Sequence, residues 1–252
     1  MQYKYAKEQP DYSDFASGRV FYSLPGHPAF PVRLASEIFQ RCLAHRAASF
    51  GITTPCTVYD PCCGAAYHLS VLGFLHGEHI QTVMGSDIDE KAVELAARNL
   101  GLLQREGLDE RIRELSGMFE QFGKESHREA RQSAAVLKEK LSVLTETRTF
   151  ETSVFQASAT DRQTISRHIK PKSVDIVFTD VPYGRHSQWR EATSKETSNP
   201  LTSMLDVLLE VLSPSSIIAI SSDKQQKAMH ERYERMEHFQ VGKRRVVILK
   251  PI

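Results

Sequence analysis

Residues 57–67 read Thr-Val-Tyr-Asp-Pro-Cys-Cys-Gly-Ala-Ala-Tyr, and this stretch decides the fold. It begins as a short apolar strand, its glycine permits a tight turn, and a helical pattern follows at Leu69, Val71, Leu72 and Leu75. The small residues let backbone amides approach a ligand at the start of the helix. The stretch therefore predicts the first strand, loop and helix of a nucleotide-binding α/β sheet.

A second strand, at residues 82–87, ends in Asp87 and leads into another helical pattern. An acid at this place usually accepts hydrogen bonds from ribose hydroxyls, although Asp87 could instead cap the helix, a role that Asp89 fills at least as well. The preceding loop has one glycine, Gly64, where a pyrophosphate-binding loop needs three, and the charge of Asp60 would repel phosphates. A cationic, phosphate-free cofactor such as S-adenosylmethionine fits better than a nicotinamide dinucleotide.

Residues 178–184, Phe-Thr-Asp-Val-Pro-Tyr-Gly, follow a third apolar strand, and their chemistry suits the binding of a planar amine that acts as a nucleophile. Ionised Asp180 can only accept hydrogen bonds, and Pro182 stiffens the turn so that the Val181 carbonyl can also point outward. Two acceptors that hold the protons of a nucleobase's exocyclic amine favour its pyramidal form, which can attack a methyl carbon. The ring of Tyr183 can stack on that nucleobase. Such an amine can lose its proton after methyl transfer, so no prior general base is required. The alternative is an ordinary Asp-x-Pro turn.

The three motifs together resemble those of class I S-adenosylmethionine-dependent methyltransferases, with Val181 in place of the first proline of the (Asp/Asn)-Pro-Pro-Tyr motif. The resemblance implies a Rossmann-like α/β fold. Ser158 stands where family members often have an acid. The implied cofactor-binding residues are Asp60, Cys62, Gly64, Asp87, Ile88, Ala157, Ser158 and Asp180, and the implied catalytic residues are Asp180, Val181, Pro182 and Tyr183.

A more specific resemblance covers most of the chain. It is to the avilamycin-resistance methyltransferases, which modify a guanosine of 23S ribosomal RNA near the peptidyl-transferase region. It implies a guanine-directed rRNA methyltransferase and resistance to orthosomycin antibiotics. The segments that carry it are residues 25–35 (Pro-Gly-His-Pro-Ala-Phe-Pro-Val-Arg-Leu-Ala), 37–41, 60–64, 71–73, 122–124 and 179–184.

Two other classes of function fit the same motifs. An enzyme of this fold could methylate adenine in DNA or RNA, or a protein glutamine, and a non-catalytic module could bind cofactor and RNA. Guanine presents N1–H and N2–H side by side to a carboxylate such as Asp180, whereas adenine presents one donor and one acceptor. This difference favours guanine, although Asp also occurs in adenine enzymes.

The net charge of +1 does not by itself indicate an RNA partner, so RNA binding requires local basic surface. Arg185 and Arg190 flank the reaction loop together with Trp189, and interleaved aromatic and basic residues suit unstacked RNA. Lys243 and Arg244 form a second candidate group. A third group is more typical of a solvated face: Arg162, Arg167, Lys170 and Lys172.

Length and composition agree with a single methyltransferase domain over residues 1–252. Hydrophobic residues make up 40% and charged residues 25%, and no window has the ~20 apolar residues of a membrane span or the apolar stretch of a signal peptide. We expect a monomeric, cytoplasmic protein. The four cysteines include no Cys-x-x-Cys pair and the ten histidines lack zinc-site spacing, so no metal is expected.

Hydrophobic periodicity predicts a mostly parallel sheet of seven strands between layers of helices. A hairpin around residues 241–243 would make one strand antiparallel. Residues 1–50 are expected to form an irregular extension with a short strand at 19–23, then a helix. Residues 104–148 predict a helical insertion, either a solvated lid packed on the core or an RNA-guiding arm. Strands are expected near 57–60, 82–87, 152–157, 174–179, 217–221, 238–241 and 245–249.

Overall fold

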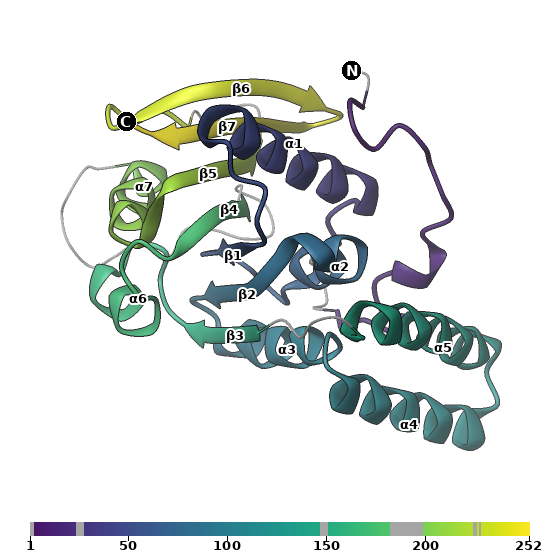
Figure 1. Cartoon of the computed structure of the whole chain (residues 1–252). Helices are drawn as coiled ribbons and strands as arrows, with labels where there is room; N and C mark the ends of the chain where they lie inside the picture. Colours follow the sequence, from purple (N-terminus) through teal and green to yellow (C-terminus); the bar gives the residue numbers. More distant parts are fainter. Residues whose placement is uncertain (1–2, 24–27, 147–150, 182–198, 224–225, 227) are drawn as a thin grey trace.

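The computed structural model describes residues 3–23, 28–146, 151–181, 199–223, 226 and 228–252, and a seven-stranded sheet forms its centre (Figure 1). The strand order is β3-β2-β1-β4-β5-β7-β6. Neighbouring strands pair in parallel except around β7, which is antiparallel to both β5 and β6. The predicted sheet with one reversed strand is confirmed. The strands are β1 Cys56–Asp60, β2 Ile80–Asp87, β3 Glu151–Gln156, β4 Val174–Asp180, β5 Leu212–Ser222, β6 Tyr233–Val241 and β7 Arg244–Pro251.

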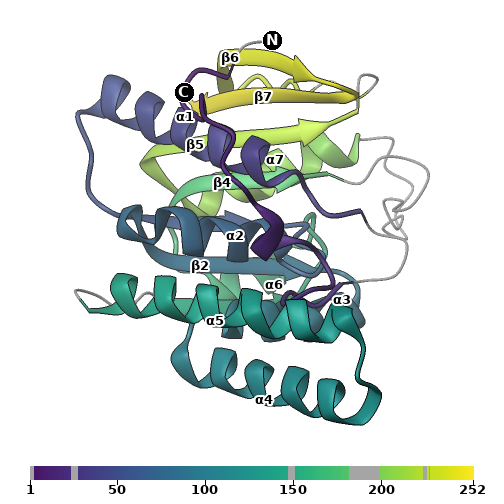
Figure 2. The same cartoon turned by 90° about the vertical axis from the view of Figure 1, so that its right-hand side faces the viewer.

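Helices cover both faces of the sheet (Figures 1 and 2). Helices α1 (Val32–Phe50), α2 (Tyr67–His76) and α3 (Glu90–Gly101) pack on one face, and α6 (Arg162–His168) and α7 (Pro200–Val211) pack on the other. Because both faces are covered, the central strand β4 is apolar along most of its length. No helix in the described part of the chain is long and apolar enough to cross a membrane.

The N-terminal extension is fixed to α1 by a buried carboxylate. Glu37 has no exposed surface, and it accepts hydrogen bonds from the backbone N–H groups of Lys4, Tyr5 and Ala6 at 2.7–2.8 Å. The pKa of Glu37 is lowered because these amides and Arg41 outweigh its burial, which alone would raise it. The backbone amides of this segment thus bond to a buried carboxylate and not to the carbonyls of a neighbouring strand.

The prediction of a short strand at residues 19–23 is wrong. Side chains form the hydrogen bonds with this segment's backbone that a neighbouring strand would otherwise have formed. The Oδ1 of Asn99 accepts from the Tyr22 N–H at 2.8 Å, and its Nδ2 donates to the carbonyls of Tyr22 and Ala65 at 2.9 and 2.8 Å. Arg111 donates to the Val20 carbonyl at 2.8 Å. The segment therefore packs against α3 and against the helix that carries Arg111, and it does not extend the sheet. The 3-10 helix η1 lies earlier in the extension, at Ser13–Phe15.

The predicted helical insertion is a pair of helices, α4 (Arg105–Phe122) and α5 (Glu125–Thr145). Helix α5 packs toward α2 and η1, and α4 lies farther from the sheet (Figure 2). Lys138 pairs with Asp109 across the two helices at 2.6 Å. Phe122 is 56% exposed, so the apolar face that holds the pair together ends before it. This packing favours a lid fixed on the core over a free arm.

We expect Asn99→Leu to lower the free energy of unfolding by about 2–3 kcal/mol, because it leaves the partly buried N–H of Tyr22 and the carbonyls of Tyr22 and Ala65 without this partner. Urea unfolding followed by circular dichroism measures the loss. Glu94→Leu, on the exposed side of the same helix, is the control and should stay within about 0.5 kcal/mol. Equal stability of the two variants would contradict the role given to Asn99.

Candidate cofactor and reaction site

Three carboxylates meet at the carboxyl edge of the sheet. Asp60 ends β1, Asp87 ends β2 and Asp180 ends β4, and these three strands are adjacent in the order β2-β1-β4. Since parallel strands end at the same edge, the three acids are brought together from distant parts of the sequence. This edge is where doubly wound sheets bind ligands.

The loop after β1 is shaped by hydrogen bonds to its own amides. The N–H groups of Cys62, Cys63 and Gly64 donate to Asp60 Oδ1, the Ser86 carbonyl and Asp87 Oδ2, each at 2.9 Å. The sequence suggested that backbone amides of this loop would bind a ligand. These three amides instead donate hydrogen bonds to groups of the protein. The carboxylates at this loop are therefore its main candidate groups for binding a ligand.

Close packing also holds this loop against β2. Gly64 has a φ of 53°, which favours glycine. At Gly85 an added Cβ would lie 2.9 Å from the Sγ of Cys63, so a side chain there would displace the loop. Cys62 and Cys63 are both free thiols, and burial raises their pKa values well above the ordinary range. Because their thiols stay protonated, both cysteines are unreactive and serve to pack the loop.

Asp60 is a buried acid whose charge is incompletely satisfied. Burial, with a smaller effect of the nearby carboxylates of Asp87 and Asp180, raises its pKa to about 8. Its Oδ2 lies 3.2 Å from the Nε2 of His68, but that nitrogen also faces the Phe178 carbonyl at 3.3 Å. Burial lowers the pKa of His68 to about 4, so the ring is neutral. Among the described residues Asp60 Oδ2 has no hydrogen-bond partner.

This chemistry fits S-adenosylmethionine, whose sulfonium and ammonium groups are cationic. A bound cation would favour ionised Asp60, whereas a phosphate would add to the repulsion among the acids. The exposed side chain of Ile88, 37% accessible beside Asp87, offers an apolar surface for a nucleobase. The sequence also allowed Asp87 to be the residue that caps the following helix. That residue is Asp89, the N-cap of α3, which accepts a hydrogen bond from the Lys91 N–H.

The β3 end lies next to Asp87. The N–H of Ala157 donates to the Asp87 carbonyl at 3.0 Å, while the Asp87 side chain accepts from the Asp89 N–H through Oδ1 at 3.0 Å. Ser158 Oγ lies 3.0 Å from the Oγ1 of Thr160. Ala157 and Ser158 thus directly follow β3, beside the acid that ends the neighbouring strand β2.

Asp180 accepts a hydrogen bond from β5 and lies near an arginine of β7. Its Oδ1 accepts from the Ser221 hydroxyl at 2.6 Å, and the Val181 N–H donates to the Ser221 carbonyl at 2.9 Å. Arg244 Nη2 lies 3.8 Å from Asp180 Oδ2. The remaining predicted residues of this region lie outside the described residues: Pro182, Tyr183, Arg185, Trp189 and Arg190.

Sequence reasoning missed Ser221 and His68, and it placed Arg244 only on an RNA surface. A signal for Ser221 existed, because a polar pair ends the apolar strand 217–220 and the ends of parallel strands meet. His68 carries no such signal, since it sits within a helical pattern. Lys243 is exposed in the turn before β7, next to Arg244.

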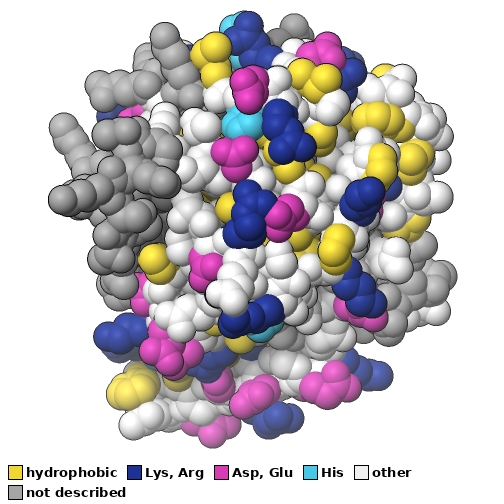
Figure 3. Space-filling model, turned by 90° about the vertical axis from the view of Figure 1, so that its left-hand side faces the viewer, with side chains coloured by type: hydrophobic (Ala, Val, Ile, Leu, Met, Phe, Trp, Pro, Cys, Tyr) yellow, Lys and Arg dark blue, Asp and Glu magenta, His cyan; other side chains and the backbone are white. Residues whose placement is uncertain are grey.

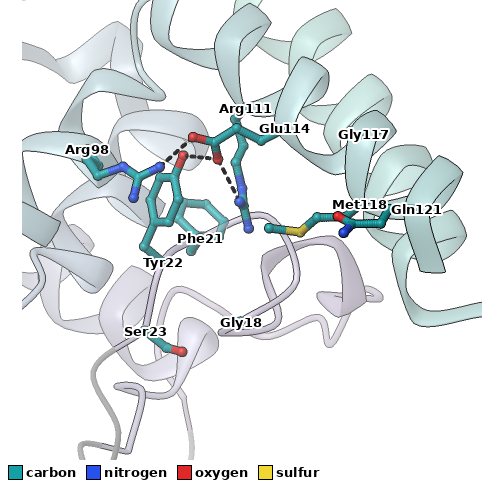
Figure 4. A pocket seen from close by; sticks show the side chains of 10 residues that line it. All are labelled: Gly18, Phe21, Tyr22, Ser23, Arg98, Arg111, Glu114, Gly117, Met118 and Gln121. Carbon is teal, nitrogen blue, oxygen red and sulfur yellow. Dashed lines mark hydrogen bonds and ion pairs between the residues drawn. The ribbon is translucent and has the colours of Figure 1, made fainter. Parts of the chain in front are cut away.

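A separate cavity of about 610 Å³ lies between the N-terminal segment and α4 (Figure 4). The guanidinium groups of Arg98 and Arg111 lie 3.8 and 4.3 Å from the centroid of the Tyr22 ring. Glu114 accepts from both arginines and from the Tyr22 hydroxyl. Through these contacts Glu114 and the two arginines hold the N-terminal segment, by Tyr22, against α3 and α4.

The face formed by α6 and α7 has no continuous basic area among its described side chains. Acidic and basic groups are interspersed there (Figure 3). Arg162, for example, forms an ion pair with Glu210 of α7. This observation agrees with the solvated-face interpretation of the group that includes Arg162.

The sheet order, the reversed β7 and the three strand-end acids define a class I S-adenosylmethionine-dependent methyltransferase. The family model "rRNA methyltransferase AviRa" matches residues 1–244. The chain therefore belongs to the AviRa family of rRNA methyltransferases.

Individual relatives agree with this assignment. The chain is 38% identical over 248 residues to the 23S rRNA (guanine(2535)-N(1))-methyltransferase of Streptomyces viridochromogenes, covering 98% of this chain and 95% of that protein. A solved structure of rRNA methyltransferase AviRa from Streptomyces viridochromogenes superposes with a TM-score of 0.86 at 36% identity, covering 99% and 96% of the two chains. A second structure of that enzyme gives 0.85 at 37% identity, covering 98% and 96%.

We expect cofactor binding to release about one proton near neutral pH, because Asp60 is protonated below its pKa of about 8 and a bound cation ionises it. The association constant for S-adenosylmethionine should therefore rise with pH up to about 8 and then level off. Calorimetric titration in buffers of different ionisation enthalpy measures the proton count. Asp60→Asn is the control, and the same proton release from that variant would exclude Asp60 as the source.

Proposed function

We propose that this protein transfers a methyl group from S-adenosylmethionine to N1 of a guanine in 23S ribosomal RNA and thereby gives resistance to orthosomycin antibiotics. The observation that carries the proposal is the placement of Asp180, positioned by Ser221 beside the acids of a cofactor site. Family membership and the guanine N1 specificity named for the Streptomyces viridochromogenes relative support it.

The cofactor half of the site is assigned to the ends of β1, β2 and β3. Asp60 faces the cationic end of the cofactor, with Cys62 and Gly64 setting the shape of the loop. Asp87 accepts from the ribose hydroxyls with lone pairs that its amide partners leave available, since each carboxylate oxygen has two. Ile88, Ala157 and Ser158 border the adenine.

The reaction half is assigned to Asp180. N1 of neutral guanine carries a proton and its lone pair is delocalised, so this proton must leave for N1 to attack. Unlike an exocyclic amine, N1 therefore requires a base, and Asp180 accepts the proton as a general base. Bound S-adenosylmethionine supplies the methyl carbon and retains the electron pair of the broken C–S bond. The products are N1-methylguanine, the thioether and one proton held by Asp180.

The target base must leave its stack to reach this edge, and a looped RNA nucleotide lowers that cost of a few kcal/mol. We assign RNA contacts to exposed Lys243 and, in the segment that follows Val181, to Arg185, Trp189 and Arg190, with Pro182 and Tyr183 at the base. All these residues come from one chain, so the proposed active species is a monomer. Its ribosomal RNA substrate makes the cytoplasm the proposed location.

Transfer of a tritiated methyl group to a 23S rRNA fragment, followed by primer extension and mass spectrometry, tests the proposal. N1 methylation blocks the Watson–Crick edge of guanine, so reverse transcriptase should stop next to the modified base. Duplex DNA and free nucleotides should stay unlabelled. Label on adenine, or on guanine N2 without a stop, would overturn the assignment.

We expect Asp180→Asn to lower kcat at least about 100-fold, because an amide cannot take the N1 proton, while cofactor affinity stays within about twofold. Single-turnover methylation and calorimetry measure the two quantities. Asp109→Asn makes the same charge change on the distant insertion and is the control. A kcat within about tenfold of the unaltered enzyme would rule out Asp180 as the base.

A further inference from the structure

The reversed direction of β7 brings a cation to the reaction edge. Asp180 pairs in register with Ser221 of β5, and Ser221 pairs with Val246 of β7. Because β7 is antiparallel, its first residue, Arg244, lies at the edge where the parallel strands end. A parallel strand in this position would have placed its first residue at the opposite edge.

Arg244 is held in place by an aromatic ring, and no described residue forms a hydrogen bond with its guanidinium. Its guanidinium lies 5.0 Å from the centroid of the Phe30 ring, and Phe30 is itself buried against Phe178 with ring centroids 5.5 Å apart. Stacking on an aromatic ring fixes a guanidinium while its N–H groups still point outward in the ring plane. The side chain is 21% exposed, and its buried Nε has no hydrogen-bond partner among the described residues.

The distance between Arg244 and Asp180 also indicates that Asp180 does not occupy a donor of Arg244. At 3.8 Å between Arg244 Nη2 and Asp180 Oδ2, the two charges attract each other but are too far apart for a hydrogen bond. Arg244 and Asp180 therefore present a donor and an acceptor side by side. The 6-oxo group and N1–H of guanine present an acceptor and a donor side by side as well.

We propose that Arg244 donates to O6 of the target guanine while Asp180 accepts its N1–H, which makes Arg244 a residue that determines base specificity and stabilises the transition state. This inference rests on the proposed function. As the N1 proton moves to Asp180, negative charge spreads from N1 to O6, where the guanidinium stabilises it. Adenine has an amino donor in place of O6, and that donor would oppose the donors of Arg244.

The decisive variant is Arg244→Gln, measured by single-turnover methylation of a synthetic 23S rRNA fragment. We expect kcat to fall about 10²–10³-fold, as for removal of one donor to a developing oxyanion, with cofactor affinity unchanged. The loss should shrink at higher pH, where solvent assists removal of the N1 proton. Arg235→Gln removes the same charge from the exposed part of β6 and should leave the rate unchanged.

Replacing the target guanine by 6-thioguanine separates the O6 contact from a purely structural role. Sulfur accepts hydrogen bonds weakly, so the ratio of the 6-thioguanine rate to the guanine rate should be lower for the unaltered enzyme than for Arg244→Gln, and the comparison cancels the greater acidity of N1 in 6-thioguanine. An equal penalty in both enzymes would overturn the proposal. So would a change confined to KM and its salt dependence, which would place Arg244 on a phosphate. Formation of N1-methylguanine by the unaltered enzyme in the same assay tests the proposed function independently.

Discussion

The concentration of three carboxylates at one edge of the sheet is the constraint on which the site depends. Like charges this close destabilise one another, and Asp60 is also fully buried. The free protein can relieve the repulsion by keeping Asp60 protonated, as its raised pKa indicates. A cationic ligand relieves it without a proton. Under the proposed assignment of the cofactor site, the same acids select for positive charge and link cofactor binding to protonation.

Asp87 connects this electrostatic feature to the shape of the site. Its two oxygens bond the amides of Gly64 and Asp89, so the loop after β1 and the start of α3 depend on one carboxylate. The close approach of Cys63 to Gly85 holds the loop from the other side. The two cofactor motifs are consequently one structural unit, although 23 residues separate Asp87 from Gly64.

The sequence predicted what depends on local periodicity and failed where the partner is distant in the chain. Strands, helices and the reversed hairpin follow from patterns within a few residues. The segment at 19–23 has strand-like residues, but its hydrogen-bond partner is Asn99, 77 residues away. The meeting of Asp180, Ser221 and Arg244 likewise depends on the register of three strands, which no local pattern specifies.

The charge beside Asp180 bears on which nitrogen reacts. A motif that supplies hydrogen-bond acceptors serves an exocyclic amine and a ring nitrogen equally well, so it does not distinguish N2 from N1. The two reactions develop opposite charges. An amine becomes positive as it attacks, and a nearby guanidinium opposes that change, whereas loss of the N1 proton leaves negative charge that a guanidinium stabilises. With Arg244 within 4 Å of Asp180, the electrostatics of this edge favour reaction at N1.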